Sequence, residues 1–282
     1  MLYYEYKYNL PNITLSNTLA RMLKILQITD LHIQPGSTET LMGIDTEASL
    51  KNVLNHAFRT HVSFDQILVT GDLAQNPSPA SYQRLYGILQ NFRTPIMCLP
   101  GNHDDFALMQ NSLQRGYITC EQYLELQNWR VIALQTQKPD SPDGEIADEQ
   151  LHYLTERLDA EPEQPVLLAM HHHCLGSGCA WLDTMQISNS AALLECINRY
   201  RQIKIVCYGH IHQEREAFIN GVGFFSTPAT CFQFQPLSQA FKIADQAPGY
   251  RVFELYPDGD FKTACYWLPE PAPGLTLDGH GY

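Results

Sequence analysis

The sequence has a deficit of positive charge and lacks any long apolar run. Its 282 residues include 18 Lys and Arg against 30 Asp and Glu, so the formal net charge is −12 with His neutral. This balance argues against general binding to nucleic acid or to a membrane surface. No apolar stretch approaches the roughly 18 residues of a membrane-spanning helix, and the opening segment has no basic stretch followed by an apolar one. We therefore expect neither export nor membrane anchoring.

The eight cysteines include no CxxC pair, which removes the usual signal for a structural zinc site. Cys98 and Cys207 lie inside apolar runs, as expected of buried, reduced thiols in a cytoplasmic protein. Apolar residues make up 44% of the chain and charged residues only 17%. This composition is typical of a globular protein, and we expect a single domain.

Short apolar runs alternate with segments of helical period after Met22. Five of the runs end at a polar cluster, so each is predicted to be a buried strand. These runs are 23–28, 67–70, 96–99, 166–170 and 203–208. The segments predicted to be helical are 45–58, 80–92, 148–158 and 188–200. Strand-helix-strand alternation predicts an α/β fold with a largely parallel core, in which the loops after the strands gather at one rim.

The remaining segments depart from this alternation. Residues 129–135 are predicted to be a further strand, and 251–267 a hairpin that turns at Asp258-Gly259, so the last third should contain more antiparallel strand. We expect an N-terminal extension over 1–21, which is polar and Tyr-rich, and one domain over 22–268. The Pro- and Gly-rich segment 269–282 is expected to form a loose tail.

The polar clusters are the part of the sequence that carries chemistry. They are Asp30-Leu31-His32, Gly71-Asp72, Gly101-Asn102-His103-Asp104, His171-His172-His173 and Gly209-His210-Ile211-His212. A DxH triplet is expected by chance and recurs at Asp278 and His280, but GNHD has an expectation of only about 0.002 and GHxH of about 0.03. Because every cluster directly follows a predicted buried strand, we expect them to meet at one site.

These residue types suit a pair of divalent metal ions. Two ions about 3.5–4 Å apart need one shared carboxylate, which Asp72 could supply, with further oxygen and imidazole ligands on each side. The remaining donors form two sets. One set contains Asp30, His32 and one of the two C-terminal histidines of GHIH. The other set contains Asn102, His171 and the second of these histidines. With a bridging hydroxide, such a site keeps a charge of about +1, which a phosphodiester monoanion would neutralise. The predicted reaction is phosphodiester hydrolysis by a metal-bound hydroxide, with His103 close enough to contact the developing charge or protonate the leaving alkoxide.

The motifs ITDLH, GDL, GNHD, the His run and GHIH, in this order, resemble the calcineurin-like metallophosphoesterase superfamily from Met22 to about Trp267. The segments 171–183, 226–236 and 247–251 further resemble the bacterial class III 3′,5′-cyclic-AMP phosphodiesterases. The resemblance implies a four-layer αββα sandwich, with helices on both outer faces of two central sheets. It also implies hydrolysis of 3′,5′-cyclic AMP to 5′-AMP.

The resemblance assigns roles to particular residues. One metal would be held by Asp30, His32, Asp72 and His212, and the other by Asp72, Asn102, His171 and His210. His103 would be the catalytic histidine, and Asn102, His103 and His212 would contact the substrate. Iron, manganese or zinc is usual in the family, in agreement with N and O donors without thiolate. Cys174 departs from the pattern, because Pro commonly follows the His run.

Several alternatives stay open at this point. Strand alternation does not by itself decide between His171 and its neighbours, and Trp181 could either stack on a nucleobase or simply pack in the protein. Rival substrates are 2′,3′-cyclic nucleotides, glycerophosphodiesters and a lipid pyrophosphate, while a scaffold that has lost catalysis is the rival from another class. A DNA-processing nuclease is disfavoured by the acidic charge. A homodimer is left open.

Overall fold

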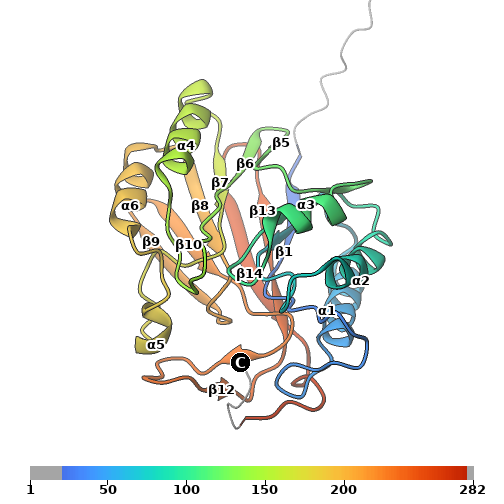
Figure 1. The fold of residues 1–282 in the computed structure, drawn as a ribbon. Coiled ribbons are helices and arrows are strands. Elements are labelled where there is room, and N and C mark those ends of the chain that lie inside the picture. The colour runs from blue at the N-terminus through green and yellow to red at the C-terminus, as the bar shows by residue number, and fades with distance from the viewer. Residues whose placement is uncertain (1–20, 278–282) are drawn as a thin grey trace, which may run out of the picture.

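The computed structural model describes residues 21–277, which form two six-stranded sheets with helices on the outer side of each (Figure 1). The α/β sandwich expected from the sequence is therefore confirmed. The expected extension lies outside the described residues except for Arg21. Among the described residues, no helix combines the length and apolar character needed to cross a membrane.

The first sheet has the strand order β14-β13-β1-β2-β3-β4. Its strands are β1 (Leu23–Ile28), β2 (Gln66–Thr70), β3 (Ile96–Leu99), β4 (Ile118–Thr119), β13 (Gly249–Leu255) and β14 (Phe261–Trp267). Strands β1, β2, β3 and β4 run parallel to one another, and the β13–β14 hairpin joins β1 in antiparallel orientation. The hairpin turns at Gly259, as the sequence predicted, and this glycine has a φ of 90°.

The second sheet has the order β5-β6-β7-β8-β10-β9. Its strands are β5 (Tyr123–Leu126), β6 (Trp129–Ala133), β7 (Val166–Ala169), β8 (Ile203–Tyr208), β9 (Arg215–Ile219) and β10 (Val222–Ser226). The β9–β10 hairpin was not predicted, although the sequence carries its signal. Asn220 and Gly221 both have positive φ, and Asn-Gly is the dipeptide most typical of such tight turns. A small third sheet pairs β11 (Gln233–Phe234) with β12 (Ile243–Ala244).

The helices cover the outer faces of the two sheets (Figure 1). Those on the first sheet are α1 (Thr46–Thr60), α2 (Pro79–Leu89) and α3 (Phe106–Leu113). The second sheet is covered by α4 (Asp148–Ala160) and α6 (Ser190–Arg199), whereas the short α5 (Ala180–Asp183) lies beyond the end of the sheet, toward β12 (Figure 1). Three apolar cores follow from this layering, one between the sheets and one under each set of helices.

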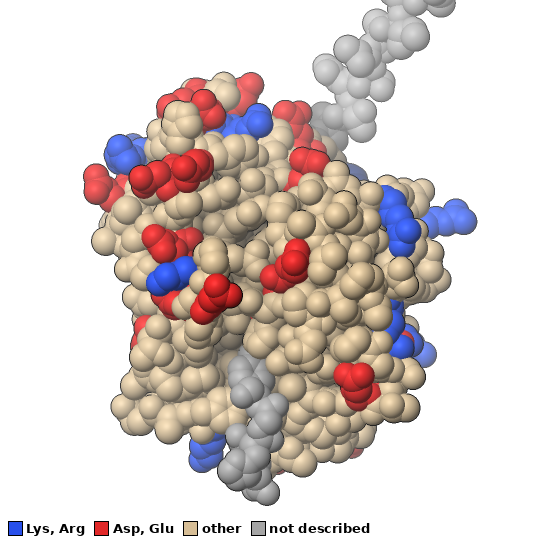
Figure 2. Space-filling model, viewed as in Figure 1, with Lys and Arg blue, Asp and Glu red and all other residues tan. Residues whose placement is uncertain are grey.

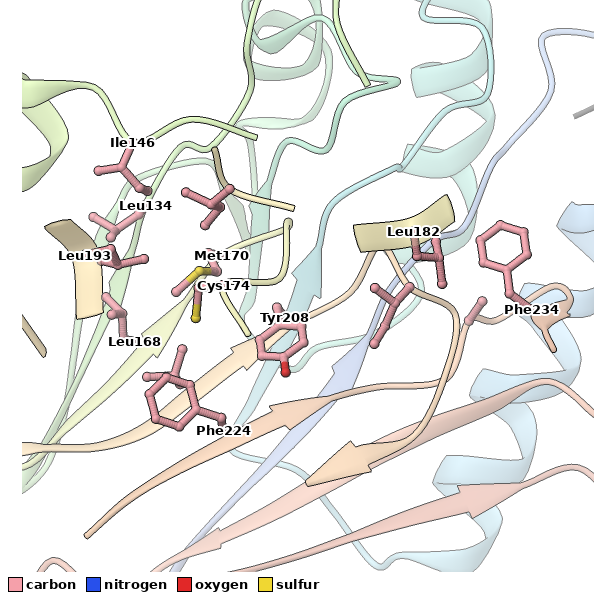
Figure 3. Packing of buried hydrophobic residues seen from close by; sticks show 14 of the residues in the cluster. Leu134, Ile146, Leu168, Met170, Cys174, Leu182, Leu193, Tyr208, Phe224 and Phe234 are labelled. Carbon is pink, nitrogen blue, oxygen red and sulfur yellow. The ribbon is translucent and has the colours of Figure 1, made fainter. Parts of the chain in front are cut away.

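Strand residues alternate between two of these cores. In β1, Ile25 packs between the sheets whereas Leu26 and Ile28 pack under the helices of the first sheet. Because both faces are buried, these strands appear in the sequence as continuous apolar runs. Figure 3 shows the corresponding packing on the outer side of the second sheet, where Leu168 and Leu193 belong to one cluster.

The surface and the C-terminal segment complete the fold. On the face drawn in Figure 2, Lys and Arg are dispersed and form no continuous basic stripe. The described part of the expected tail, residues 269–277, forms no helix or strand. It is less loose than its composition suggested, because the N–H of Thr276 donates to the carbonyl of Met42 at 3.0 Å and Ala272 is buried.

A polar bridge joins the two sheets directly below the rim where their parallel strands end. Gln27 of β1 is fully buried and donates to Oγ1 of Thr70 at 2.9 Å and to the carbonyl of Tyr208 at 3.2 Å. Its own oxygen accepts from the hydroxyl of Thr227 at 2.6 Å. Thr70 ends β2 of the first sheet and Tyr208 ends β8 of the second. The bridge therefore holds the carboxyl ends of the two sheets together.

Candidate metal centre and active site

The five polar clusters follow β1, β2, β3, β7 and β8, and the structure brings their side chains together at one rim. This meeting of loops is the outcome expected when parallel strands end at the same edge. The strand pattern of the sequence therefore predicted that these side chains would lie close together. Two donor groups can be distinguished within it.

The first donor group contains Asp30, His32 and His212. The Nε2 atom of His212 lies 3.4 Å from Oδ1 of Asp30 and 3.3 Å from Nε2 of His32. Nε2 of His32 in turn lies 3.9 Å from Oδ2 of Asp72. All three residues of this group are fully buried.

The second donor group contains Asn102, His171 and His210. Nε2 of His171 lies 3.1 Å from Oδ1 of Asn102 and 3.2 Å from Oδ2 of Asp72. The rings of His171 and His210 are 5.1 Å apart, centroid to centroid. The same oxygen of Asp72 thus faces both groups, which is the position that a shared carboxylate requires.

The donor set fits divalent metal ions. Two imidazoles are oriented through their second nitrogen, because Nδ1 of His171 contacts the carbonyl of Thr70 and Nδ1 of His212 that of Phe232, each at 2.8 Å. Such bonds fix the tautomer that presents the Nε2 lone pair to a metal. Nε2 of His210 is buried without a hydrogen-bond partner among the described residues. The lone pair of such a buried nitrogen is available to coordinate a metal ion.

The backbone at the candidate ligands is unusual. Five of them have left-handed φ values: Asp30 (54°), His32 (46°), Asp72 (50°), His210 (66°) and His212 (46°). Such a conformation costs on the order of 1–3 kcal/mol per residue and persists where the surrounding structure imposes it. Its concentration at one rim marks these loops as shaped for a site rather than for stability.

Two glycines allow these loops to approach one another. A Cβ atom on Gly71, which has a φ of 97°, would overlap the imidazole of His171. A Cβ on Gly101 would overlap the carboxylate of Asp72. The glycines of GDL and GNHD are therefore needed for close approach, in addition to the polar residues that follow them.

The electrostatics of the cluster favour positive charge. Burial acts to raise the pKa of Asp72, but the nearby His171 and His103 outweigh it and hold this pKa well below its ordinary value. Burial likewise acts to lower the pKa of His171, yet the charge of Asp72 raises it to about 9. His32, which is dominated by burial, has its pKa lowered to about 3. Asp72 and Asp30 favour a proton on the buried imidazole of His171. A metal cation can take the place of that proton.

A residue that the sequence reasoning left without a role holds two of these loops together. The carboxylate of Asp104 accepts from the backbone N–H of Leu73 and Gly101 at 2.9 Å, from that of Ala74 at 3.1 Å and from the hydroxyl of Tyr82 at 3.0 Å. Burial and the charge of Asp72 raise its pKa to about 6. The signal was present, because an Asp directly after Asn-His in a loop can accept from neighbouring backbone N–H groups.

The other histidines of the run lie differently from His171. Nδ1 of His172 lies 2.6 Å from Oγ1 of Thr136, and Nε2 of His173 lies 3.5 Å from Oδ1 of Asp183. Burial lowers the pKa of His172 well below its ordinary value and that of His173 to about 4. Nε2 of His171 contacts both Asp72 and Asn102, which favours His171 over its neighbours as the ligand.

In this structure Trp181 packs against other aromatic side chains. Its ring makes edge contacts with Phe234 and Phe241, with centroids 4.9 Å and 5.2 Å apart. Phe234 in turn stacks on His212 at 4.3 Å. Cys174 and Cys179 are buried thiols. Cys231 also lies close to the first donor group, since its thiol donates to the carbonyl of Asp30 at 3.2 Å.

A sequence model of the calcineurin-like phosphoesterases matches residues 23–214, which carry all of these motifs. The chain belongs to the calcineurin-like phosphoesterase family. This membership confirms the resemblance drawn from the motifs and places the chain among phosphoester hydrolases. A likeness to a dimetal phosphatase structure from Danio rerio, with a TM-score of 0.57, 14% identity and coverage of 88% of this chain and all of that one, agrees on the fold.

Curated relatives in the family are similar over nearly the whole chain. A protein of Haemophilus influenzae named 3′,5′-cyclic adenosine monophosphate phosphodiesterase CpdA is 37% identical over 262 residues, or 93% of this chain and 96% of that protein. The Escherichia coli protein of the same name is 38% identical, with 88% of this chain and 90% of that protein covered. A Nostoc protein named 3′,5′-cyclic-nucleotide phosphodiesterase is 34% identical, with 89% and 94% covered.

Proposed function

We propose that the chain is a dinuclear metal-dependent phosphodiesterase that hydrolyses 3′,5′-cyclic AMP to 5′-AMP. The observation that carries the proposal is the position of Asp72, whose Oδ2 lies 3.2 Å from His171 and 3.9 Å from His32. A single oxygen that faces two separate N and O donor groups is suited to join two ions. The names of the relatives supply the substrate, since they act on 3′,5′-cyclic nucleotides.

The proposed ligands are divided as the two donor groups suggest. One ion would be held by Asp30, His32, Asp72 and His212, and the other by Asp72, Asn102, His171 and His210. When bound, two ions of iron, manganese or zinc would supply Lewis acidity that activates water and withdraws charge from the phosphoryl oxygens. The carboxylates of Asp30 and Asp72 leave such a site with a small positive charge, which suits a phosphodiester monoanion.

His103 is the proposed proton donor. Its backbone N–H donates to Oδ1 of Asp72 at 2.9 Å, which places the residue next to the shared carboxylate. Its Nδ1 lies 3.3 Å from the carbonyl of Gln75, so that bond orients the ring and assigns Nδ1 the role of donor to the backbone. The proton exchanged with the leaving 3′ oxygen would then be carried on Nε2. Together with Asn102 and His212, His103 is proposed to contact the phosphate.

We also propose a cytoplasmic location. The eight cysteines are free thiols, and seven of them are buried. Such thiols persist without protection in the reducing cytosol. Fractionation of cells that express the chain, followed by immunodetection, tests this part of the proposal.

A substrate panel tests the proposed activity. Metal-reconstituted protein is incubated with 3′,5′-cyclic AMP, 2′,3′-cyclic AMP, glycerophosphocholine and bis(4-nitrophenyl) phosphate, and the products are separated by chromatography. The expected result is preferential formation of 5′-AMP that stops when a chelator is added. Cleavage of the aryl diester without cleavage of cyclic AMP would retain the reaction class and refute the substrate.

A matched pair of histidine variants controls this experiment. His171→Ala removes a proposed ligand, whereas His152→Ala removes an imidazole with 73% of its side chain exposed on α4. The first variant should lose activity on every substrate and the second should retain it. Equal activity in both variants would contradict the assignment of His171. No turnover on any substrate, with two metal ions bound to the wild type, would favour a binding role.

A further inference from the structure

The candidate site is accessible from one side. Of its eight side chains, Asp30, His32, Asp72, His171, His210 and His212 are at most 5% exposed. Asn102 and His103 are the two that are partly exposed. Because the other candidates are buried, we expect a substrate to approach the donor groups past Asn102 and His103.

A hollow of about 870 Å³ lies on this accessible side. Its lining includes Asn102 and His103 on one loop, and Gln135 with residues 137–142 on another. Small-molecule sites typically have volumes of about 300–1,000 Å³, so the hollow is large enough for a nucleoside. It is continuous with the catalytic groups because two of them line it.

The side next to His212 is packed with aromatic side chains instead. Phe234 stacks on the His212 ring at 4.3 Å, and Trp181 and Phe241 pack against Phe234. The indole nitrogen of Trp181 is itself buried. This aromatic wall, defined by Trp181, Phe234 and Phe241, packs behind the His212 ring, and its own edge contacts occupy part of its ring surface.

We propose that the nucleoside half of the substrate occupies the hollow beyond His103, and that the side-chain amide of Gln135 reads the edge of the base. This inference rests on the proposed function and adds a binding subsite to it. The ligand class is a neutral heteroaromatic base with its ribose. The phosphate would lie at Asn102 and His103, with the base directed away from His212.

The chemistry of the lining suits a neutral group. The cation in the lining, Lys138, is paired with Asp143 at 3.0 Å, and the carboxylates of Asp105 and Asp140 also line or border the hollow. These acids would repel a second phosphate, which disfavours a pyrophosphate or a nucleic-acid strand in this position. They can instead accept hydrogen bonds from ribose hydroxyls or from an exocyclic amine. An amide such as that of Gln135 can pair with the N6 and N7 edge of adenine through two hydrogen bonds.

The loop that carries Gln135 is held in place before any ligand binds. The N–H of Gln135 donates to Oε1 of Gln150 at 3.0 Å. Two residues on, Nε2 of Gln137 donates to the carbonyls of Gly101 at 2.6 Å and Asp104 at 2.7 Å. The two loops that line the hollow are thus bonded to each other, and a pre-organised lining lowers the entropic cost of binding.

The test compares two substrates in one variant. For Gln135→Leu, we expect kcat/KM for 3′,5′-cyclic AMP to fall about tenfold further than kcat/KM for bis(4-nitrophenyl) phosphate, which has no base. The matched control is Gln83→Leu, since Gln83 is exposed on α2 and does not line the hollow. Thermal midpoints of both variants show whether the fold is retained. Inhibition of aryl-diester cleavage by 5′-AMP gives a second readout, with a Ki about tenfold higher in Gln135→Leu.

The outcomes separate this inference from the proposed function. Wild-type protein that cleaves the aryl diester but not cyclic AMP would contradict the function and the inference together. Wild-type protein active on cyclic AMP, with an unchanged substrate ratio and an unchanged Ki in Gln135→Leu, would contradict the inference alone. A Trp181→Leu variant that selectively loses cyclic AMP would place the base against the aromatic wall and also overturn the inference.

Discussion

Replacing Asp104 with Ala should destabilise the protein by about 4 kcal/mol, although Asp104 is not a proposed ligand. The variant removes the acceptor for three buried backbone N–H groups, those of Leu73, Ala74 and Gly101. Each buried donor left without a partner costs about 1–3 kcal/mol. The hydroxyl of Tyr82 lies 3.4 Å from the carbonyl of Asp105 and can turn to it, so it adds little to the sum.

A graded series of variants tests this reasoning. Tyr82→Phe removes the hydroxyl that donates to Asp104 and accepts from the backbone N–H of Asp105, and it should cost about 2 kcal/mol. Asp104→Asn should fall between the two, because an amide can still accept from some of the donors but opposes others with its own N–H groups. The assay is urea unfolding of each protein after its metal has been removed with a chelator. In thermal unfolding, the Asp104→Ala change corresponds to a midpoint lowered by about 10 °C.

The position of Asp104 also makes a functional prediction. It ties the loop of Asp72 to the loop of Asn102, so the Ala variant should bind metal more weakly at both donor groups. An Asp104→Ala protein within about 1 kcal/mol of the wild type, with unaltered metal content, would refute the account of this clamp.

Three further perturbations probe other parts of the structure. Gln27→Leu should lower the free energy of unfolding by about 2 kcal/mol, measured in urea, because it leaves buried groups of both sheets unpaired; an unchanged value would mean that the bridge between the sheets carries no net stability. Removal of metal with a chelator should lower the thermal midpoint by several degrees, and re-addition of Mn²⁺ should restore it, since an ion bound only to the folded state stabilises it by mass action; a midpoint insensitive to both would argue against an occupied site. Asn102→Ala should reduce metal content and turnover together, whereas His103→Ala should lower kcat by about 10²–10⁴ with metal content retained, as determined by elemental analysis and kinetics; an unaltered rate in the second variant would remove His103 from the mechanism.

The elements that the sequence predicted well are those whose signal is local. The runs 23–28 and 203–208 are strands as expected, because a strand buried on both faces is recognisable by its apolar residues alone. The division into two sheets could not be obtained in this way, since periodicity does not say which strands pair. It was expected only from the family resemblance.

The candidate site shows the same division between local and tertiary information. The eight side chains were predicted from motifs at strand ends, but the groups that position them were not predicted. Gln27 acts through Tyr208 and Thr227, which are about 200 residues away in the chain, and a partner at that separation leaves no pattern in the sequence. Trp181 is a similar case, because its packing depends on Phe234 and Phe241 of a hairpin that was not predicted.

The most direct test of the central claim is a metal titration followed by turnover of 3′,5′-cyclic AMP. Metal-free protein is titrated with Mn²⁺, and the rate of 5′-AMP formation is measured at each ratio of metal to protein. The account predicts that full activity requires two equivalents, and that Asp72→Ala shows none at any ratio. Full activity at one equivalent, or an active Asp72→Ala protein, would contradict a dinuclear site joined by Asp72.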